Sequence, residues 1–212
     1  MHLKFNIYLF IFLLVISATV CSQNTDIDIL KPINKYESGF KNTWSELNTG
    51  ATTTLSISIP AGLAITGFIR RDKKMKQDAM YMGAAFLAST LVTKSVKHMV
   101  NRQRPFTKYP FIVKRAYSKT GLSFPSGHTS AAFSTATSVS LRYRKWYIIA
   151  PACIFAASVG WARMYQGVHY PSDVLAGALT GAASAWLGYK TQKWMAGKKE
   201  QKKKLTLYYD RY

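Results

Sequence analysis

The pairing of His169 with Asp173 is the first arrangement in this sequence that could do chemistry. Pro171 lies between them, and proline is favoured at the first position of a helix. A helix beginning there would place Asp173 in its first turn, close enough to reach back to the His169 ring. The carboxylate would then fix the tautomer of the imidazole and stabilise positive charge on it. The alternative is an ordinary first-turn acid favoured by the helix dipole.

A second candidate site lies in the segment from Ser123 to His128. Pro125 can open a helix, and Gly127 lets the backbone approach a ligand closely. Free N–H groups at a helix start, together with the Ser126 hydroxyl, form a natural cradle for a phosphate. His128 would stand beside this cradle, unless it is a helix cap or a surface histidine.

Five stretches of the chain could form the elements that hold these residues. They carry no Lys, Arg, Asp or Glu and span residues 51–69, 79–93, 120–141, 146–162 and 174–189. Such lengths suit helices better than strands. Gly177, Gly181 and Ala185 recur every four residues, which lets helices approach closely. We therefore predict an all-α helical bundle that is transmembrane, with about five mature spans plus a signal sequence or first span.

A soluble helical bundle with small-residue cores is the alternative, because the mean hydropathy is −0.04 and three stretches are shorter than about 18 residues. The placement of charge favours the membrane. The net charge is +20, and basic clusters at 70–76, 142–145 and 190–204 follow the first, third and fifth stretches. If the N-terminus is cytoplasmic, the signal is the first span and each stretch crosses the membrane once, all three clusters lie on the cytoplasmic side. There they would contact anionic headgroups. Nucleic acid is not an expected partner, since the clusters lie at hydrophobic boundaries without interleaved aromatic residues.

The connection from Lys94 to Phe124 is external on the same count, yet it is strongly basic. The positive-inside tendency argues against basic residues there. A bound polyanion explains them, because guanidinium groups match phosphate oxygens two at a time. Each cation alone would more often be a solvated surface charge. The basic residues after Lys94 are Lys97, Arg102, Arg104, Lys108, Lys114, Arg115 and Lys119.

Three short segments together resemble the signature of the type 2 phosphatidic acid phosphatase and vanadium haloperoxidase superfamily, namely K-x6-R-P, P-S-G-H and S-R-x5-H-x3-D. One departure is Ala162, where the family usually has serine, and it removes one hydroxyl contact to phosphate. The flanking helices fit the six-span membrane branch of the family. The matching residues are Lys97, Arg104 and Pro105, then Pro125 to His128, then Arg163, His169 and Asp173.

This resemblance implies a phosphatase with a histidine nucleophile. His169 would attack phosphorus and form a phosphohistidine, with Asp173 orienting the ring. His128 would protonate the leaving oxygen and later take a proton from water. The groups that would hold the phosphate oxygens are Lys97, Arg104, Arg163, Ser126 and the Gly127 amide. No metal or other cofactor is expected, because these fixed cations would do its electrostatic work, and vanadate is expected to inhibit.

The sequence also predicts the domain organisation. Residues 1–22 would be a signal peptide or first transmembrane helix, with lipidation at Cys21 as a third reading. Residues 23–49 would be a polar periplasmic arm, 50–190 the helical phosphatase domain with its active site at 97–173, and 191–212 a basic cytoplasmic tail. Two cysteines, Cys21 and Cys153, do not suggest a disulfide framework.

The expected substrate is a phosphate monoester or diphosphate ester of a membrane lipid, at the periplasmic face of a bacterial-type inner membrane. Phosphatidate, phosphatidylglycerol phosphate, undecaprenyl diphosphate and phosphorylated lipid A would all fit. The alternatives are a soluble periplasmic non-specific acid phosphatase, a vanadium haloperoxidase in which His169 ligates vanadium, and an inactive lipid-phosphate binder. Neither the lipid nor the oligomeric state can be read from the sequence.

Overall fold

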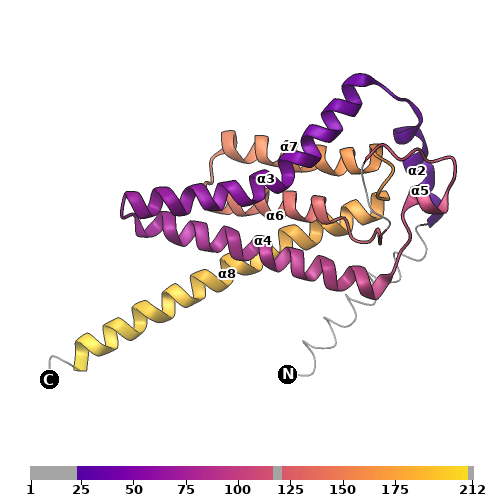
Figure 1. Cartoon of the computed structure of the whole chain (residues 1–212). Coiled ribbons are helices and arrows are strands. Elements are labelled where there is room, and N and C mark those ends of the chain that lie inside the picture. The colour runs from indigo at the N-terminus through magenta and orange to yellow at the C-terminus, as the bar shows by residue number, and fades with distance from the viewer. Residues whose placement is uncertain (1–22, 117–120, 210–212) are drawn as a thin grey trace.

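The computed structural model describes residues 23–116 and 121–209, so the expected signal at 1–22 lies outside the described residues. The described part is helical and contains no strand, which confirms the all-α prediction. Five long helices run side by side, and two shorter ones lie at one end of the bundle (Figure 1). The helices are α2 (Gln23–Lys35), α3 (Gly39–Ile69), α4 (Lys73–Val100), α5 (Pro105–Lys108), α6 (Gly127–Arg142), α7 (Trp146–Tyr165) and α8 (Pro171–Tyr209).

Helix α6 is the centre of the bundle, in contact with α3, α4, α7 and α8. Helices α2 and α5 lie at the end where α4 and α7 finish and where α6 and α8 begin (Figure 1). The C-terminal part of α8 extends beyond the bundle in the opposite direction. The two loops that carry the sequence motifs therefore meet at one end of the molecule.

Small residues let α8 lie directly against α6, as their four-residue spacing predicts. A Cβ atom added to Gly177 would lie 2.5 Å from the Ser126 carbonyl oxygen, and one added to Gly181 would lie 2.1 Å from that of Ser130. Ala185 continues this face and is fully buried. Any larger side chain at these glycines would push α8 off α6 and move the start of both helices.

The bundle buries many polar groups among small apolar clusters, and its outer surface carries large apolar side chains. The buried side of α6 carries hydroxyls, including Ser130 and Ser134, whereas Phe68 on α3 is 69% exposed and Ile154 on α7 is also 69% exposed. Soluble proteins rarely show large continuous apolar surfaces to water. Two described helices, α3 and α7, are long and apolar enough to cross a membrane. Each of the five long helices overlaps one of the five uncharged stretches, but the number of spans stays a prediction.

Three expected boundaries differ from the structure. The division at residue 50 falls inside α3, and the tail that was expected from 191 continues α8 without a break. The basic loop that was expected from Lys94 begins only at Asn101, because lysine and methionine support a helix and do not end one. Asn101 ends α4 in the left-handed conformation with φ 51°, which asparagine tolerates.

We expect Gly181→Ala to lower the stability of the bundle, because its methyl group would collide with the backbone of Ser130 and not with a flexible side chain. Overpacking of this kind costs about 1–3 kcal/mol. The measurement is the thermal unfolding midpoint of the purified protein. The matched control is Gly83→Ala in α4, where no atom lies within 4 Å of the added Cβ and the midpoint should hold or rise. Equal midpoints for both variants would contradict the close packing of α6 against α8.

Candidate active site

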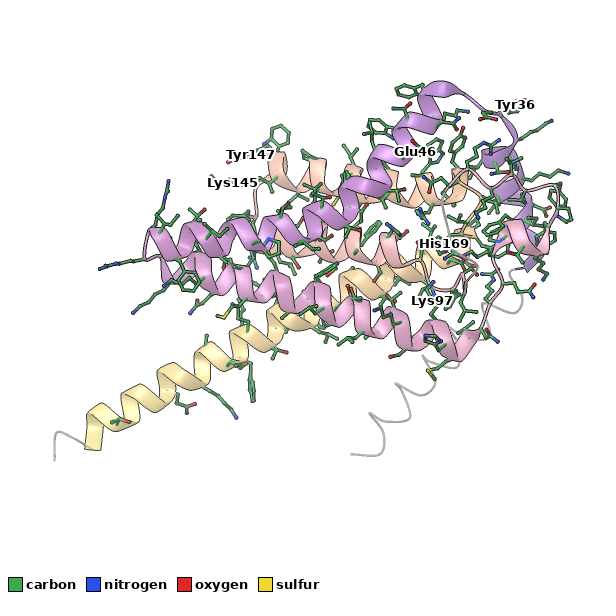
Figure 2. All side chains as sticks on the ribbon, in the orientation of Figure 1. Tyr36, Glu46, Lys97, Lys145, Tyr147 and His169 are labelled. Atoms are coloured by element: carbon green, nitrogen blue, oxygen red, sulfur yellow. The ribbon has the colours of Figure 1, made fainter. Side chains whose placement is uncertain are left out.

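The eight residues predicted for the site converge at the end of the bundle that carries α2 and α5. The last turn of α4 supplies Lys97, and Figure 2 shows it at the same end as His169. The last turn of α7 supplies Arg163, and the first turn of α8 supplies Asp173. The start of α6 brings Ser126, Gly127 and His128, while Arg104 precedes α5. All these groups lie at or next to helix ends, so the geometry of the site depends on where each helix begins or ends.

His169 and Asp173 lie together as their spacing predicts. The distance from His169 Nδ1 to Asp173 Oδ2 is 3.5 Å, and both side chains are almost fully buried. The same oxygen accepts the Tyr170 N–H at 2.9 Å. A separation of 3.5 Å is longer than a good hydrogen bond, and catalytic hydrogen bonds are often long before substrate binds. Asp173 is thus placed to orient the ring through Nδ1.

The turn before His169 requires Gly167, which the sequence motifs did not single out. Gly167 has φ 70°, and a Cβ atom there would lie 2.5 Å from the Val113 carbonyl oxygen. Only glycine fits both the conformation and the space.

Burial holds the pKa of His169 well below its ordinary value, and the positive charges of Arg163 and Arg104 lower it further. The imidazole is therefore neutral at pH 7 and keeps a lone pair for attack.

The three predicted phosphate-binding cations bond to neutral oxygens. Lys97 Nζ donates to the Leu122 carbonyl at 2.8 Å. Arg104 donates to the carbonyls of Gly121 and Val168, each at 3.2 Å. Arg163 donates to the Gln166 side-chain oxygen at 2.6 Å. Over residues 23–116 and 121–209, no carboxylate forms an ion pair with any of the three. Asp173 offsets part of the charge of Lys97 and Arg104 without direct contact, and a polyanion is the ligand that would offset the rest.

Arg102 differs from these three cations, although it belongs to the basic loop that is predicted to bind a polyanion. Its Nη1 donates to Asp173 Oδ1 at 2.8 Å, and its Nη2 donates to Asp26 Oδ2 at 2.7 Å. The guanidinium also lies over the Tyr170 ring, 3.9 Å from the centroid. Two carboxylates thus neutralise the charge of Arg102, and its guanidinium is bonded within the protein and is not free to bind a ligand. No local spacing marks this, because Asp26 lies 76 residues away.

The start of α6 differs in one respect from the prediction. Pro125 was expected to open the helix, but α6 begins at Gly127 with Ser126 as its N-cap. Ser126 makes no side-chain cap hydrogen bond; its hydroxyl oxygen accepts from the Thr129 hydroxyl at 2.9 Å, and its N–H donates to the Asp173 carbonyl at 2.9 Å. The Cβ position of Gly127 has only a Thr93 methyl nearby, at 3.8 Å. Packing therefore does not require glycine there, and its open side leaves room for a ligand.

Gln166 is a further site residue that the sequence motifs missed. Its side-chain oxygen accepts from Arg163, while its amide nitrogen donates to the Ser45 carbonyl at 3.1 Å and to the Thr49 hydroxyl at 3.2 Å. The first part of α3 therefore holds Gln166, and Gln166 holds Arg163. Within the described residues, no group of three or more His, Cys, Asp or Glu side chains could hold a metal ion.

A helical bundle with two histidines and three cations gathered at one end is the arrangement expected from the sequence motifs, and the comparisons with known families give the class of this protein. Residues 78–196, more than half of the 212-residue chain, match the family model of the PAP2 superfamily. The chain belongs to this superfamily. The match includes all eight predicted site residues but neither α2 nor α3.

Three known proteins illustrate the relationship. The bacitracin transport permease protein BcrC of Bacillus licheniformis is 32% identical over 120 residues, which are 56% of this chain and 57% of BcrC. The lipid A 4′-phosphatase of Bacteroides thetaiotaomicron is 32% identical over 89 residues, 42% of this chain and 39% of that protein. The chain spans about half the length of these curated relatives.

The third is a solved structure. The crystal structure of the first transmembrane PAP2 type phosphatidylglycerolphosphate phosphatase from Bacillus subtilis superposes with a TM-score of 0.70 at 24% identity. The superposition covers 88% of this chain and 95% of that one. The two proteins share their fold over nearly the whole bundle.

We expect Gln166→Leu to weaken the binding of inorganic phosphate about tenfold. The charged Arg163 guanidinium would lose its hydrogen bond to the Gln166 side-chain oxygen. Gln166→Glu should weaken binding further, since a carboxylate there would neutralise Arg163. Isothermal titration calorimetry measures both. Gln192→Glu is the matched control, because Gln192 accepts from Arg142 at 3.4 Å, outside the site. Unchanged phosphate affinity in Gln166→Glu would refute the role of Arg163.

Proposed function

We propose that this protein is a metal-independent phosphatase that hydrolyses phosphate mono- or diphosphate esters of membrane lipids through a phosphohistidine at His169. One observation carries the proposal. A neutral, buried histidine lies beside three cations that form no ion pair with a carboxylate among the described residues. Such a site binds a phosphate group most strongly when negative charge builds on its oxygens, that is, in the transition state.

The chemistry proceeds in two displacements. The free imidazole nitrogen of His169 attacks phosphorus, the bond to the ester oxygen breaks, and His128 gives that oxygen a proton. Burial and the charge of Arg163 lower the pKa of His128 to about 4 in the free protein, and the negative charge of a bound phosphate raises this pKa so that His128 can carry the proton. Asp173 stabilises the positive charge that develops on the His169 ring. Water then attacks the phosphohistidine and gives a proton to His128. Inorganic phosphate leaves, and both histidines return to their starting state.

The fixed cations replace a metal ion in this scheme. Lys97, Arg104 and Arg163 come from three different segments, so they can surround the non-bridging oxygens of one phosphate. The Gly127 N–H and the Ser126 hydroxyl at the start of α6 add neutral donors, and the positive end of the helix favours the anion. Ala162 contributes no hydroxyl where the family usually has serine, so Ser126 is the expected hydroxyl donor.

A lipid substrate is supported by the outer surface of the bundle and by the relatives. The outward apolar side chains of α3 and α7 suit an acyl environment. One relative is a lipid A 4′-phosphatase. We propose substrates in which the phosphate lies at the membrane surface: phosphatidate, phosphatidylglycerol phosphate, undecaprenyl diphosphate or lipid A type molecules.

The direction in which the site faces is supported by the distribution of charge. The α6–α7 turn, with Lys145, lies at the end of the bundle opposite Lys97 and His169 (Figure 2). The α3–α4 turn, with Arg70 and Arg71, lies at that same opposite end (Figure 1). Basic turns favour the cytoplasm. We therefore place the site at the periplasmic face of a bacterial-type inner membrane.

We expect His169→Ala to lower phosphate release from a lipid phosphate by more than about a thousandfold, because the nucleophile is lost. His128→Ala should slow release by about 10²–10⁴-fold, with a smaller loss for a nitrophenyl ester, whose leaving group needs no proton. His98→Ala, an exposed histidine of α4, is the matched control. Rapid quench with ³²P-labelled substrate should trap acid-labile label on the wild type but not on His169→Ala.

The same assay tests the absence of a metal requirement. Activity should persist in EDTA and fall when vanadate is added. Loss of activity in EDTA would contradict the fixed-cation mechanism, and full activity of His169→Ala would refute the nucleophile. A panel of lipid phosphates and diphosphates beside a soluble chromogenic ester identifies the substrate class.

We expect the protein to stay in the membrane fraction after alkaline carbonate extraction, because its exposed surface is apolar. In a variant with serine at Cys21 and Cys153, Phe111→Cys at the site end should react with an impermeant maleimide added from the periplasmic side. Lys145→Cys at the far end should not react. Release by carbonate would favour a soluble periplasmic phosphatase, and the reverse labelling pattern would overturn the orientation.

A further inference from the structure

Two buried carboxylates share the Arg102 guanidinium, and one of them belongs to the N-terminal helix α2. Asp26 and Asp173 are 2% and 0% exposed. The Arg102 guanidinium donates one hydrogen bond to each carboxylate, at 2.7 Å to Asp26 and 2.8 Å to Asp173. The residue that orients the proposed nucleophile is therefore joined through one side chain to a residue that lies outside the family match at 78–196.

We propose that Asp26 is a positioning residue that acts through Arg102 to set the charge and orientation of Asp173 beside His169. The inference deepens the proposed phosphohistidine mechanism and rests on it. Asp26 touches no reacting atom, so its effect on the reaction must pass through its partners, the Arg102 guanidinium and Ser172.

Several contacts fix Asp26 in this position. The Ser172 N–H donates to Asp26 Oδ1 at 2.9 Å, and the Ser172 hydroxyl donates to Oδ2. Arg102 also donates to the Ser172 hydroxyl at 2.7 Å. Ser172 immediately precedes Asp173 in the first turn of α8. Asp26 thus binds both the guanidinium and the backbone that carries Asp173, which fixes the direction of that carboxylate.

Helix α2 is itself anchored to the site, so Asp26 is not on a loose arm. The Asn34 side chain donates to the carbonyls of Tyr165 and Val113, both at 2.9 Å, and accepts the Val113 N–H at 2.8 Å. Leu30 is fully buried against Ile112 and Tyr170. These contacts hold α2 across the loops on either side of His169.

The electrostatic consequence follows from counting charges. Asp26, Arg102 and Asp173 together carry one net negative charge, which faces His169. A phosphorylated His169 ring is positively charged, and a net negative group stabilises it. Without the Asp26 charge, Arg102 would neutralise Asp173 alone, and the group would be neutral. The intermediate would lose stabilisation although His169, Asp173 and all three phosphate-binding cations remain in place.

The test compares Asp26→Asn with Asp28→Asn, the same chemical change two residues along α2 at an exposed position. Asp26→Asn should lower kcat about tenfold or more, as losses of such supporting partners do, while KM changes less than about twofold. The acid limb of the kcat/KM profile, which reports deprotonation of His169, should move to lower pH. Asp26→Glu should recover part of kcat. Asp28→Asn should match the wild type throughout.

A double-mutant cycle tests the route through Arg102. In an Arg102→Gln background, Asp26→Asn should cause a much smaller loss of kcat, because the link through the guanidinium is already broken and only the Ser172 contacts remain. Independent, multiplicative losses would overturn the route. An Asp26→Asn protein with lowered thermal stability but unchanged kcat and pH profile would reduce Asp26 to a structural brace and overturn the proposal.

A measurement without turnover separates this inference from the proposed function. Histidine-selective ¹⁵N labelling with NMR titration should show that Asp26→Asn lowers the pKa of His169 and that Asp28→Asn does not. An unchanged His169 titration in Asp26→Asn would overturn the inference even if the wild type is an active phosphatase. A wild type that releases no phosphate would instead overturn the proposed function, while this titration still decides whether Asp26 acts on His169.

Discussion

Repulsion between like charges is the constraint on which the rest of this structure depends. Lys97, Arg104 and Arg163 lie around one imidazole, and no carboxylate of the described chain is paired with them. Carbonyl and amide oxygens hold them in place instead. Neutral acceptors fix the position of a cation without cancelling its charge, so the site is a preformed receptor for negative charge. Folding must supply the energy that keeps these cations together before any ligand arrives.

Close helix packing supplies part of that energy and also the geometry. Each catalytic group stands within a turn or two of a helix end, so a small displacement of one helix along another would separate the groups. Gly177 and Gly181 bring α8 against the backbone of α6, and the Ser126 N–H bonds to the Asp173 carbonyl at 2.9 Å. The starts of these two helices are thereby fixed to each other, and with them the cradle at Ser126 and the carboxylate at Asp173.

The sequence was informative wherever the chemistry is local. Asp173 lies in the first turn of α8, which begins at Pro171, and reaches back to His169, two residues before the helix. The glycine spacing in α8 indicated close packing because residues four apart share one face of a helix. The sequence was silent on partners far apart in the chain: Asp26 with Arg102, Asn34 with Tyr165, and Gln166 with Ser45. A single sequence holds no periodic pattern for pairs of this kind, because only the fold makes them neighbours.

The boundaries that were predicted less well have physical causes of their own. Charged residues were taken as the end of a helix at Lys94, but lysine is a good helix former, and α4 continues to Val100. The polar composition of residues 23–49 suggested an arm. Its polar groups instead make buried contacts to the site, as Asp26 and Asn34 show.

Helix α8 is a single rod that carries Asp173 in its first turn and the lysine-rich segment at its other end. Its 39 residues correspond to about 58 Å at 1.5 Å per residue, nearly twice the roughly 30 Å of a hydrocarbon layer. With its first turn at one surface of a membrane, the rod must stand several turns clear of the other surface. A force or a binding partner that tilts its free end would therefore move the opposite end, where the catalytic carboxylate lies, without entering the compartment that the site faces.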